Sequence, residues 1–223
     1  MCYLIPVYDW EVKGKEKQKP TINEKVLKRF APKYVKEPVN ESFNIKELFD
    51  EKRKAFIPKR EAEVILKEKR FEKLQQNIEK KFMDNLKTLE NIKTKEELLE
   101  EFSKLWKRRR RFKEHIEKRK ALKHIPDKNP ELIYIKQIFN VLSEFDNVFI
   151  EKTKSGSQID YIHKDDWVVI INQNGKIETA YKLESPLSRW IKRHKIKNEI
   201  TRGNINEEFK KSVKSLWNRI KLL

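Results

Sequence analysis

The chain has 223 residues, and its 53 Lys and Arg outnumber its 35 Asp and Glu, giving a net charge of +18. No apolar run approaches the roughly 18 residues that a membrane span needs, and the single cysteine, Cys2, excludes an intramolecular disulfide framework. Leu, Ile, Val and Phe together exceed the share of about a fifth below which chains rarely bury a core, so we expect a folded cytoplasmic protein with a polyanionic partner and no membrane partner.

The first part of the chain, residues 1–58, is expected to be a separate N-terminal segment. A short apolar run at residues 3–8 precedes a Lys-rich linker at residues 13–20. A helical stretch is expected at residues 45–56, before Pro58.

The second part begins with a long amphipathic helix, because apolar residues recur at helical spacing over residues 60–91. Thr94 followed by Glu97 forms a capping box, which predicts the start of a new helix. The apolar stripe of this second helix continues to Ile116. Two such helices joined by a short turn predict an antiparallel hairpin, or a coiled-coil arm, over residues 59–117.

The third part, residues 118–223, combines helices with strands. Asn129 and Pro130 begin a helix, as cap and first-turn residue. Two basic helices end the chain, one at residues 187–197 and one that Asn206 is predicted to cap. Four strands are expected between the helix at Asn129 and these basic helices, at residues 147–152, 158–163, 167–172 and 176–183. The third strand is continuously apolar and is therefore predicted to be central. Asn174-Gly175 is predicted to join the last two strands as a hairpin. The predicted fold class is α+β: a long helical hairpin, then a helix with a four-stranded antiparallel sheet, then C-terminal helices.

Basic residues concentrate in two segments of the chain. Residues 104–123 carry eleven Lys and Arg against two Glu, and residues 185–223 carry eleven against three, whereas residues 129–184 are net negative. Such clusters bind nucleic acids because each neutralised phosphate releases condensed counterions. A solvated helix face and an acidic protein partner are the alternatives. The predicted nucleic-acid contacts are Lys107, Arg108, Arg109, Arg110, Arg111, Arg119, Lys120, Lys123, Arg189, Lys192 and Arg193.

The sequence lacks the motifs of metal, nucleotide and acyl-transfer sites. It contains no H-E-x-x-H, no cysteine pair, no glycine-rich phosphate loop and no G-x-S-x-G. Asp165-Asp166 is interpreted as a turn, so neither a metal nor a cofactor is expected. Metal-free RNA cleavage remains, in which a ribose 2′-hydroxyl attacks the neighbouring phosphate. It requires only a proton acceptor, a proton donor and cations or hydroxyls on the phosphate.

The candidate acid/base group is one of four histidines, His115, His124, His163 and His194. We select His124, because the basic residues just before it would lower its pKa and ready it as a base. It also precedes the helix predicted to begin at Asn129, where free backbone N–H groups could bind a phosphate.

Four pieces of sequence carry a resemblance, namely Lys123-His124-Ile125, Asn129-Pro130-Glu131-Leu132, Trp167-Val168-Val169-Ile170-Ile171 and the hairpin from Asn174 to Leu183. Over residues 118–185 the chain resembles the barnase/EndoU/colicin/RelE-like nuclease superfamily, particularly its phage and polymorphic-toxin branch. The resemblance implies that His124 is the general acid/base and that Lys123 or Arg119 contacts the phosphate. Thr179 and Tyr181 would offer hydroxyl groups to that phosphate.

The predicted function is thus a metal-independent endoribonuclease of toxin or phage type, with RNA as substrate. An antitoxin or assembly partner would bind the helical N-terminal region. Two alternatives remain open. One is a non-catalytic module that binds nucleic acid or protein on a degenerate nuclease-like fold, and the other is a structural component of a phage or ribonucleoprotein assembly.

Overall fold

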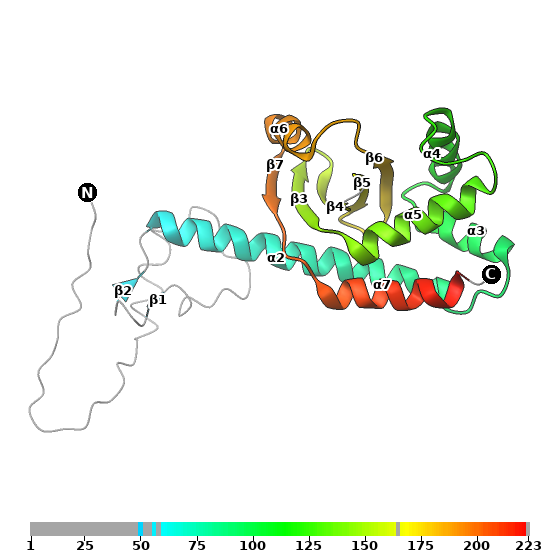
Figure 1. The fold of residues 1–223 in the computed structure, drawn as a ribbon. Coiled ribbons are helices and arrows are strands. Elements are labelled where there is room, and N and C mark those ends of the chain that lie inside the picture. Colours follow the sequence, from blue (N-terminus) through cyan, green and yellow to red (C-terminus); the bar gives the residue numbers. More distant parts are fainter. Residues whose placement is uncertain (1–48, 51–54, 57–58, 164–165, 222–223) are drawn as a thin grey trace, which may run out of the picture. The chain divides into compact units, whose positions relative to one another are not determined.

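The computed structural model describes residues 49–50, 55–56, 59–163 and 166–221 (Figure 1). The apolar run and the linker predicted near the N-terminus lie outside these residues. Of the helical stretch predicted for residues 45–56, the described residues form two short antiparallel strands, β1 (Phe49–Asp50) and β2 (Ala55–Phe56). The prediction of a helix is therefore wrong for these four residues, whose backbones form an antiparallel strand pair instead.

Two compact units divide the chain, Met1–Arg70 and Phe71–Leu223. The second unit contains the end of the long helix α2 and most of the other elements. These are α2 (Lys59–Leu86), the 3-10 helix η2 (Lys87–Leu89), α3 (Lys95–Lys104), α4 (Arg109–Ala121), α5 (Pro130–Glu144), β3 (Asn147–Thr153), β4 (Gly156–Ile162), β5 (Trp167–Asn172), β6 (Ile177–Lys182), α6 (Leu187–Lys197), β7 (Glu199–Arg202) and α7 (Glu207–Ile220).

The predicted α+β class is confirmed, and the four predicted strands are all present as β3 to β6. The sheet is antiparallel throughout, in the order β6-β5-β4-β3-β7. Its fifth strand, β7, was not predicted, because four residues directly after a helix are too few to display strand alternation. The predicted central strand, β5, pairs on both edges and is buried along its whole length.

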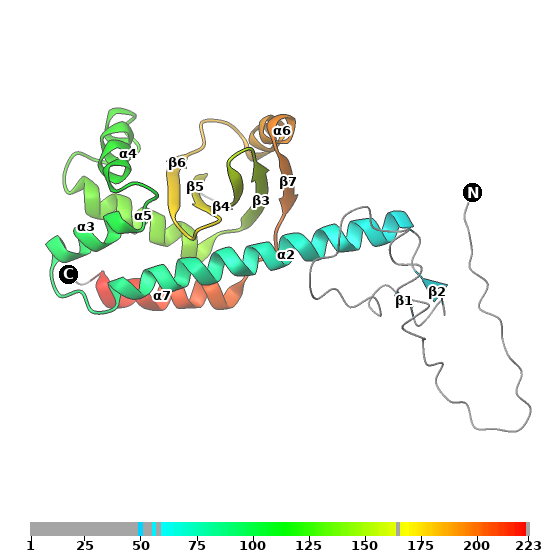
Figure 2. The same ribbon diagram turned by 180° about the vertical axis from the view of Figure 1, so that it is seen from behind.

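Each face of the sheet has its own hydrophobic core. One face packs against α2, α5 and α7, and buries alternate strand residues such as Ile159, Tyr161 and Val169. The opposite face has a smaller cluster, into which α6 inserts Trp190. Figures 1 and 2 show α2 and α7 side by side beneath the sheet, with α6 near β3 and β7 and α4 near β6. This opposite face, named the second face because it carries the smaller cluster, therefore lies between two basic helices.

The predicted second helix of the hairpin is interrupted, which corrects the expectation of one continuous helix. The segment between α3 and α4 pairs with β6, since Ile177 N donates to Leu105 O (2.8 Å) and Lys107 N donates to Ile177 O (3.0 Å). This pairing replaces the helical hydrogen bonds. The apolar stripe that includes Phe102 and Ile116 joins the same core as the sheet.

Two of the three predicted helix caps are confirmed. The side chains of Thr94 and Asn206 accept hydrogen bonds from backbone amides three residues ahead, at 3.2 and 3.1 Å. Asn129 occupies the cap position of α5 in the left-handed region (φ 50°), and its side chain makes no capping hydrogen bond. Its contribution to the helix start is therefore conformational.

The hairpin predicted at Asn174-Gly175 joins β5 to β6. Gly175 N donates to Asn172 O (2.9 Å), and Asn172 Oδ1 accepts from Asn174 N (2.9 Å). Gly175 has φ +65°, and a Cβ added there would lie 2.6 Å from the backbone of Lys81 and Phe82 in α2. Only glycine satisfies both the turn and this close approach.

Candidate active site

The candidate site begins at a contact between α4 and β6 on the second face of the sheet. His115 Nδ1 and Thr179 Oγ1 lie 3.3 Å apart. The His115 ring also packs against Trp106, with ring centroids 5.0 Å apart. Because Phe112 and Ile116 anchor α4 in the core, residues 111, 115 and 119, one turn apart, share another side of the helix.

Arg119 is the central cation of this group. Its side chain is buried, only 6% exposed, and its guanidinium lies 5.7 Å from the ring centre of Tyr181. Among the residues that the structure describes, no carboxylate forms an ion pair with it, and its Nε has no hydrogen-bond partner. A buried cation without a counter-ion is costly, and an anion would relieve that cost.

His115 is held in its neutral form. Burial lowers its pKa from 6.5 to about 4, and the charges of Arg119, Arg111 and Lys118 act in the same direction. At neutral pH the imidazole therefore carries a free lone pair and can accept a proton.

Tyr181 and Thr179 are two residues apart on β6 and project from the same side of the strand. Burial raises the pKa of Tyr181, and its hydroxyl accepts a hydrogen bond from Trp190 Nε1 (3.0 Å). The phenol keeps its proton and remains a donor. Beneath it, Tyr134 donates to Ala180 O (2.8 Å), which fixes the α5 side of the strand.

His124 lies just beyond the end of α4. Its backbone N–H donates to Arg119 O (2.9 Å), and its ring meets the Trp167 ring edge-on, with centroids 6.3 Å apart. Its pKa is lowered as predicted, but burial is the larger cause and the charge of Arg119 the smaller one. Its Nδ1 is buried without a partner among the described residues. The imidazole that contacts Thr179 is thus His115, and the catalytic role of His124 stays a prediction.

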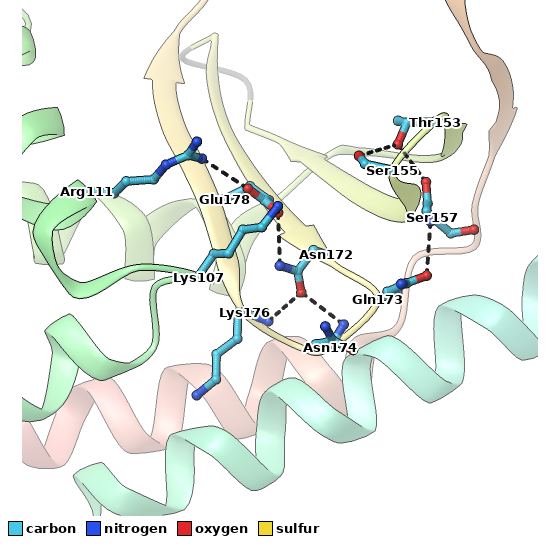
Figure 3. A network of polar contacts seen from close by, with 11 residues as sticks. Lys107, Arg111, Thr153, Ser155, Ser157, Asn172, Gln173, Asn174, Lys176 and Glu178 are labelled. Atoms are coloured by element: carbon cyan, nitrogen blue, oxygen red, sulfur yellow. Dashed lines mark hydrogen bonds and ion pairs between the residues drawn. The ribbon is translucent and has the colours of Figure 1, made fainter.

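Two of the predicted nucleic-acid contacts bind the same carboxylate, that of Glu178. Lys107 Nζ lies 2.7 Å and Arg111 Nη1 3.2 Å from the Glu178 carboxylate (Figure 3). Glu178 is an extra residue in β6, because the pairing with β5 shifts between Ile170 and Ile171. This bulge aims its side chain at α4 and partly neutralises the basic run.

The other predicted contacts of α4 differ in their neighbours. Arg108 and Arg109 are exposed and form no ion pair with a described carboxylate. Arg110 pairs with Glu114 at 3.6 Å, and Lys120 pairs with a glutamate one turn before it at 3.3 Å. Lys123 is exposed, in the left-handed turn after α4.

The predicted contacts of α6 lie at the other end of the second face. Arg189, Lys192 and Arg193 are exposed, and Arg193 donates to Ser185 Oγ (2.7 Å). Trp190 anchors the helix over the sheet. No role was predicted for His115, although its spacing of four from Arg111 and from Arg119 indicates that the three residues share a helix face.

Residues 96–221, more than half of the chain, match the model of a family described as "Uncharacterised protein aq_aa01". No curated protein and no solved structure matches the chain. The predicted relationship to the barnase/EndoU/colicin/RelE-like nucleases stays a prediction. Within the described residues, no helix combines the length and the apolar character needed to cross a membrane.

Proposed function

The chain belongs to this uncharacterised aq_aa01 family, and we propose that it is a metal-independent endoribonuclease acting by 2′-hydroxyl attack. The observation that carries the proposal is the buried Arg119, which lacks a carboxylate partner among the described residues and lies beside a neutral imidazole. A phosphodiester is an anion, and its cleavage by a 2′-hydroxyl is promoted by a cation on the phosphate and a group that accepts the hydroxyl proton.

In the proposed reaction the Arg119 guanidinium binds a non-bridging oxygen of the phosphate. His115 takes the proton from the ribose 2′-hydroxyl as the 2′-oxygen forms its bond to phosphorus. The bond from phosphorus to the 5′-oxygen breaks, and His124 gives that oxygen a proton. The charge of the bound phosphate raises the pKa of both imidazoles, so that His124 can carry the proton it donates.

Thr179 and Tyr181 have a supporting role in this proposal. The Thr179 hydroxyl is within reach of His115 and orients its ring. The protonated Tyr181 hydroxyl donates to the phosphate, since Trp190 already occupies one of its acceptor positions. The products are a 2′,3′-cyclic phosphate and a free 5′-hydroxyl.

RNA would be held by the exposed cations on either side of this face, namely Arg108 and Arg109 at the start of α4 and those of α6. An antitoxin or an assembly partner would bind the helical N-terminal region and leave the face free. We place the protein in the cytoplasm, where RNA is available.

The test is cleavage of a single-stranded RNA by the full chain in EDTA, well below its measured unfolding midpoint. We expect 2′,3′-cyclic phosphate ends, and no cleavage of an oligonucleotide whose ribose lacks the 2′-hydroxyl. His115→Ala and Arg119→Ala should each lower kcat/KM at least about 100-fold. The matched control is Lys113→Ala, an exposed cation of the same helix.

A second candidate function is RNA binding without cleavage, which the exposed Arg108 and Arg109 also support. Salt-dependent binding by a wild-type protein that never cleaves would establish it. Equal cleavage by wild type and Arg119→Ala would refute the proposed site.

A further inference from the structure

Three ligand-type side chains meet on the second face of the sheet, away from His115. Glu151 comes from β3, Asp160 from β4 and His194 from α6, and one nitrogen or oxygen atom of each lies within 4.8 Å of the others. On β3, Glu151 stands two residues from Phe149, the pairing partner of Asp160, so both carboxylates project from one face.

The position of His194 follows from its spacing on α6. Trp190 and His194 are four residues apart on α6 and stack with ring centroids 3.9 Å apart. Because Trp190 is buried in the cluster over the sheet, His194 is directed toward β3, where its Nδ1 contacts Glu151 Oε1.

Both carboxylates are fully buried, each with 0% exposure. The described residues supply them with amide donors: Gln158 Nε2 donates to both, at 3.1 and 3.2 Å, and Asn198 Nδ2 donates to Glu151 at 3.2 Å. No Lys or Arg among these residues forms an ion pair with either carboxylate. Burying two carboxylates against one imidazole is costly without a further positive charge.

One oxygen of the cluster has no hydrogen-bond partner within the described part of the chain. Asp160 Oδ2 is buried and makes no hydrogen bond with any described residue. Burial, and next the charge of Glu151, raise the pKa of Asp160, so a bound cation would compete with a proton for this carboxylate. A metal ion needs only the lone pair that Oδ2 leaves unused.

We propose that Glu151, Asp160 and His194 bind one divalent transition-metal ion, with an affinity for Zn²⁺ above that for Mn²⁺. Imidazole with two carboxylates suits these ions, whereas Mg²⁺ prefers oxygen ligands alone. The ion takes the place of the direct contact between His194 and Glu151. Gln158 and Asn198 orient the ligating carboxylates from outside.

The role of the ion is structural, and the site is separate from the proposed ribonuclease chemistry. It ties α6 to β3 and β4, and Trp190 of α6 in turn donates to Tyr181. Metal binding thus stabilises one side of the candidate active site without contacting RNA.

The test begins with the full chain, from which bound metal is removed with a chelator. The protein is then dialysed against Zn²⁺, Mn²⁺ or Mg²⁺. Its metal content, its affinity for each ion and its thermal unfolding midpoint are measured. We expect one bound Zn²⁺ per chain, weaker Mn²⁺, no Mg²⁺, and a midpoint that rises with Zn²⁺. Asp160→Asn and His194→Gln should each weaken Zn²⁺ binding at least about 100-fold. The matched control, Asp146→Asn at an exposed aspartate, should bind like wild type.

Two results would overturn the proposal: wild type that retains no Zn²⁺, or Asp160→Asn that retains it with unchanged affinity. Circular dichroism identifies any variant that has not folded, and His194→Gln then decides in place of Asp160→Asn. Cleavage is measured separately, so that a protein that cleaves RNA but retains no Zn²⁺ after dialysis against it refutes this site and leaves the ribonuclease proposal standing.

Discussion

Thr179 Oγ1 on β6 lies 3.3 Å from His115 Nδ1 on α4, so that a hydroxyl and an imidazole 64 residues apart in sequence share one contact. Arg119, one turn further along α4, lies over the ring of Tyr181 on the same strand. Two contacts therefore fix the helix to the strand along one side. The cation, the neutral base and both hydroxyls are positioned together before any ligand arrives.

Replacing Arg119 should separate stability from activity. Arg119→Met removes a buried charge that has no carboxylate partner among the described residues. The methionine side chain fills a similar volume. We expect the free energy of unfolding to stay unchanged or to rise by about 1 kcal/mol, while RNA cleavage falls at least about 100-fold. Urea unfolding and initial-rate kinetics on the same preparations measure both.

Arg111→Met is the matched control for this prediction. Arg111 is also on α4, but its guanidinium pairs with Glu178, whose side chain is 17% exposed. Its removal should lower the free energy of unfolding by about 0.5–1 kcal/mol. A clear loss of stability in Arg119→Met would show that the guanidinium has a structural role.

The pKa of His115 predicts how folding stability depends on pH. Burial and the charges of Arg119, Arg111 and Lys118 hold its pKa at about 4, against 6.5 for an ordinary histidine. Between these pH values the unfolded state binds the proton more readily, so stability falls as the pH decreases from 6.5 to 4. NMR titration of the His115 ring should give a midpoint near 4. His115→Gln should lose part of the pH dependence of unfolding over that window.

The pKa of His115 also predicts that the pH profiles of kcat/KM and of kcat have different acid limbs. The acid limb of kcat/KM reports the free enzyme and should lie near the His115 pKa of about 4. The acid limb of kcat reports the complex and should lie at higher pH, because bound phosphate offsets the charge of Arg119. Coincident limbs, or a limb of kcat/KM above pH 6, would remove His115 from the mechanism.

The sequence predicted the periodic elements well, because helix and strand patterns are local. Long-range pairing was not visible in it. The break between α3 and α4 exists because Leu105 and Lys107 pair with Ile177, and a helical stripe continues across that break without interruption. The bulge at Glu178 likewise arises from its pairing with β5.

The candidate site was predicted only in part, because some of its residues share one strand and others come together through long-range packing. Thr179 and Tyr181 share a face of one strand, which strand alternation specifies. Which histidine reaches them depends on how α4 packs, and the core residues Phe112 and Ile116 select His115. The cluster of Glu151, Asp160 and His194 joins three separate elements, and no spacing in the sequence marks it.

Gly175 provides a test of the hairpin and of its contact with α2. In Gly175→Ala the new Cβ would lie 2.6 Å from the backbone of Lys81 and Phe82, in a conformation with φ +65°. We expect a loss of more than about 1 kcal/mol in the free energy of unfolding. Asn174→Ala, at the exposed neighbour, should cost about 0.5 kcal/mol or less. Equal losses would mean that the hairpin moves away from α2 at little cost.

Glu178 allows a test of how far a carboxylate of the chain itself neutralises the basic residues Lys107 and Arg111. Glu178→Gln removes the carboxylate that holds Lys107 and Arg111 (Figure 3). Two cations then become available to phosphates, so RNA should bind more tightly and log K should fall more steeply with log salt, by about 0.7 per added phosphate contact. Fluorescence anisotropy with a labelled RNA over a salt series measures the slope.

Glu114→Gln controls for the change in net charge. Glu114 is exposed and pairs only loosely with Arg110, at 3.6 Å, so the substitution alters the overall charge equally but releases no closely held cation. Its salt dependence should remain close to that of wild type. If both variants change the slope by the same amount, the overall charge controls RNA affinity and the Glu178 contacts do not. A steeper slope in Glu178→Gln alone assigns the effect to Lys107 and Arg111, the two cations that the bulge in β6 holds.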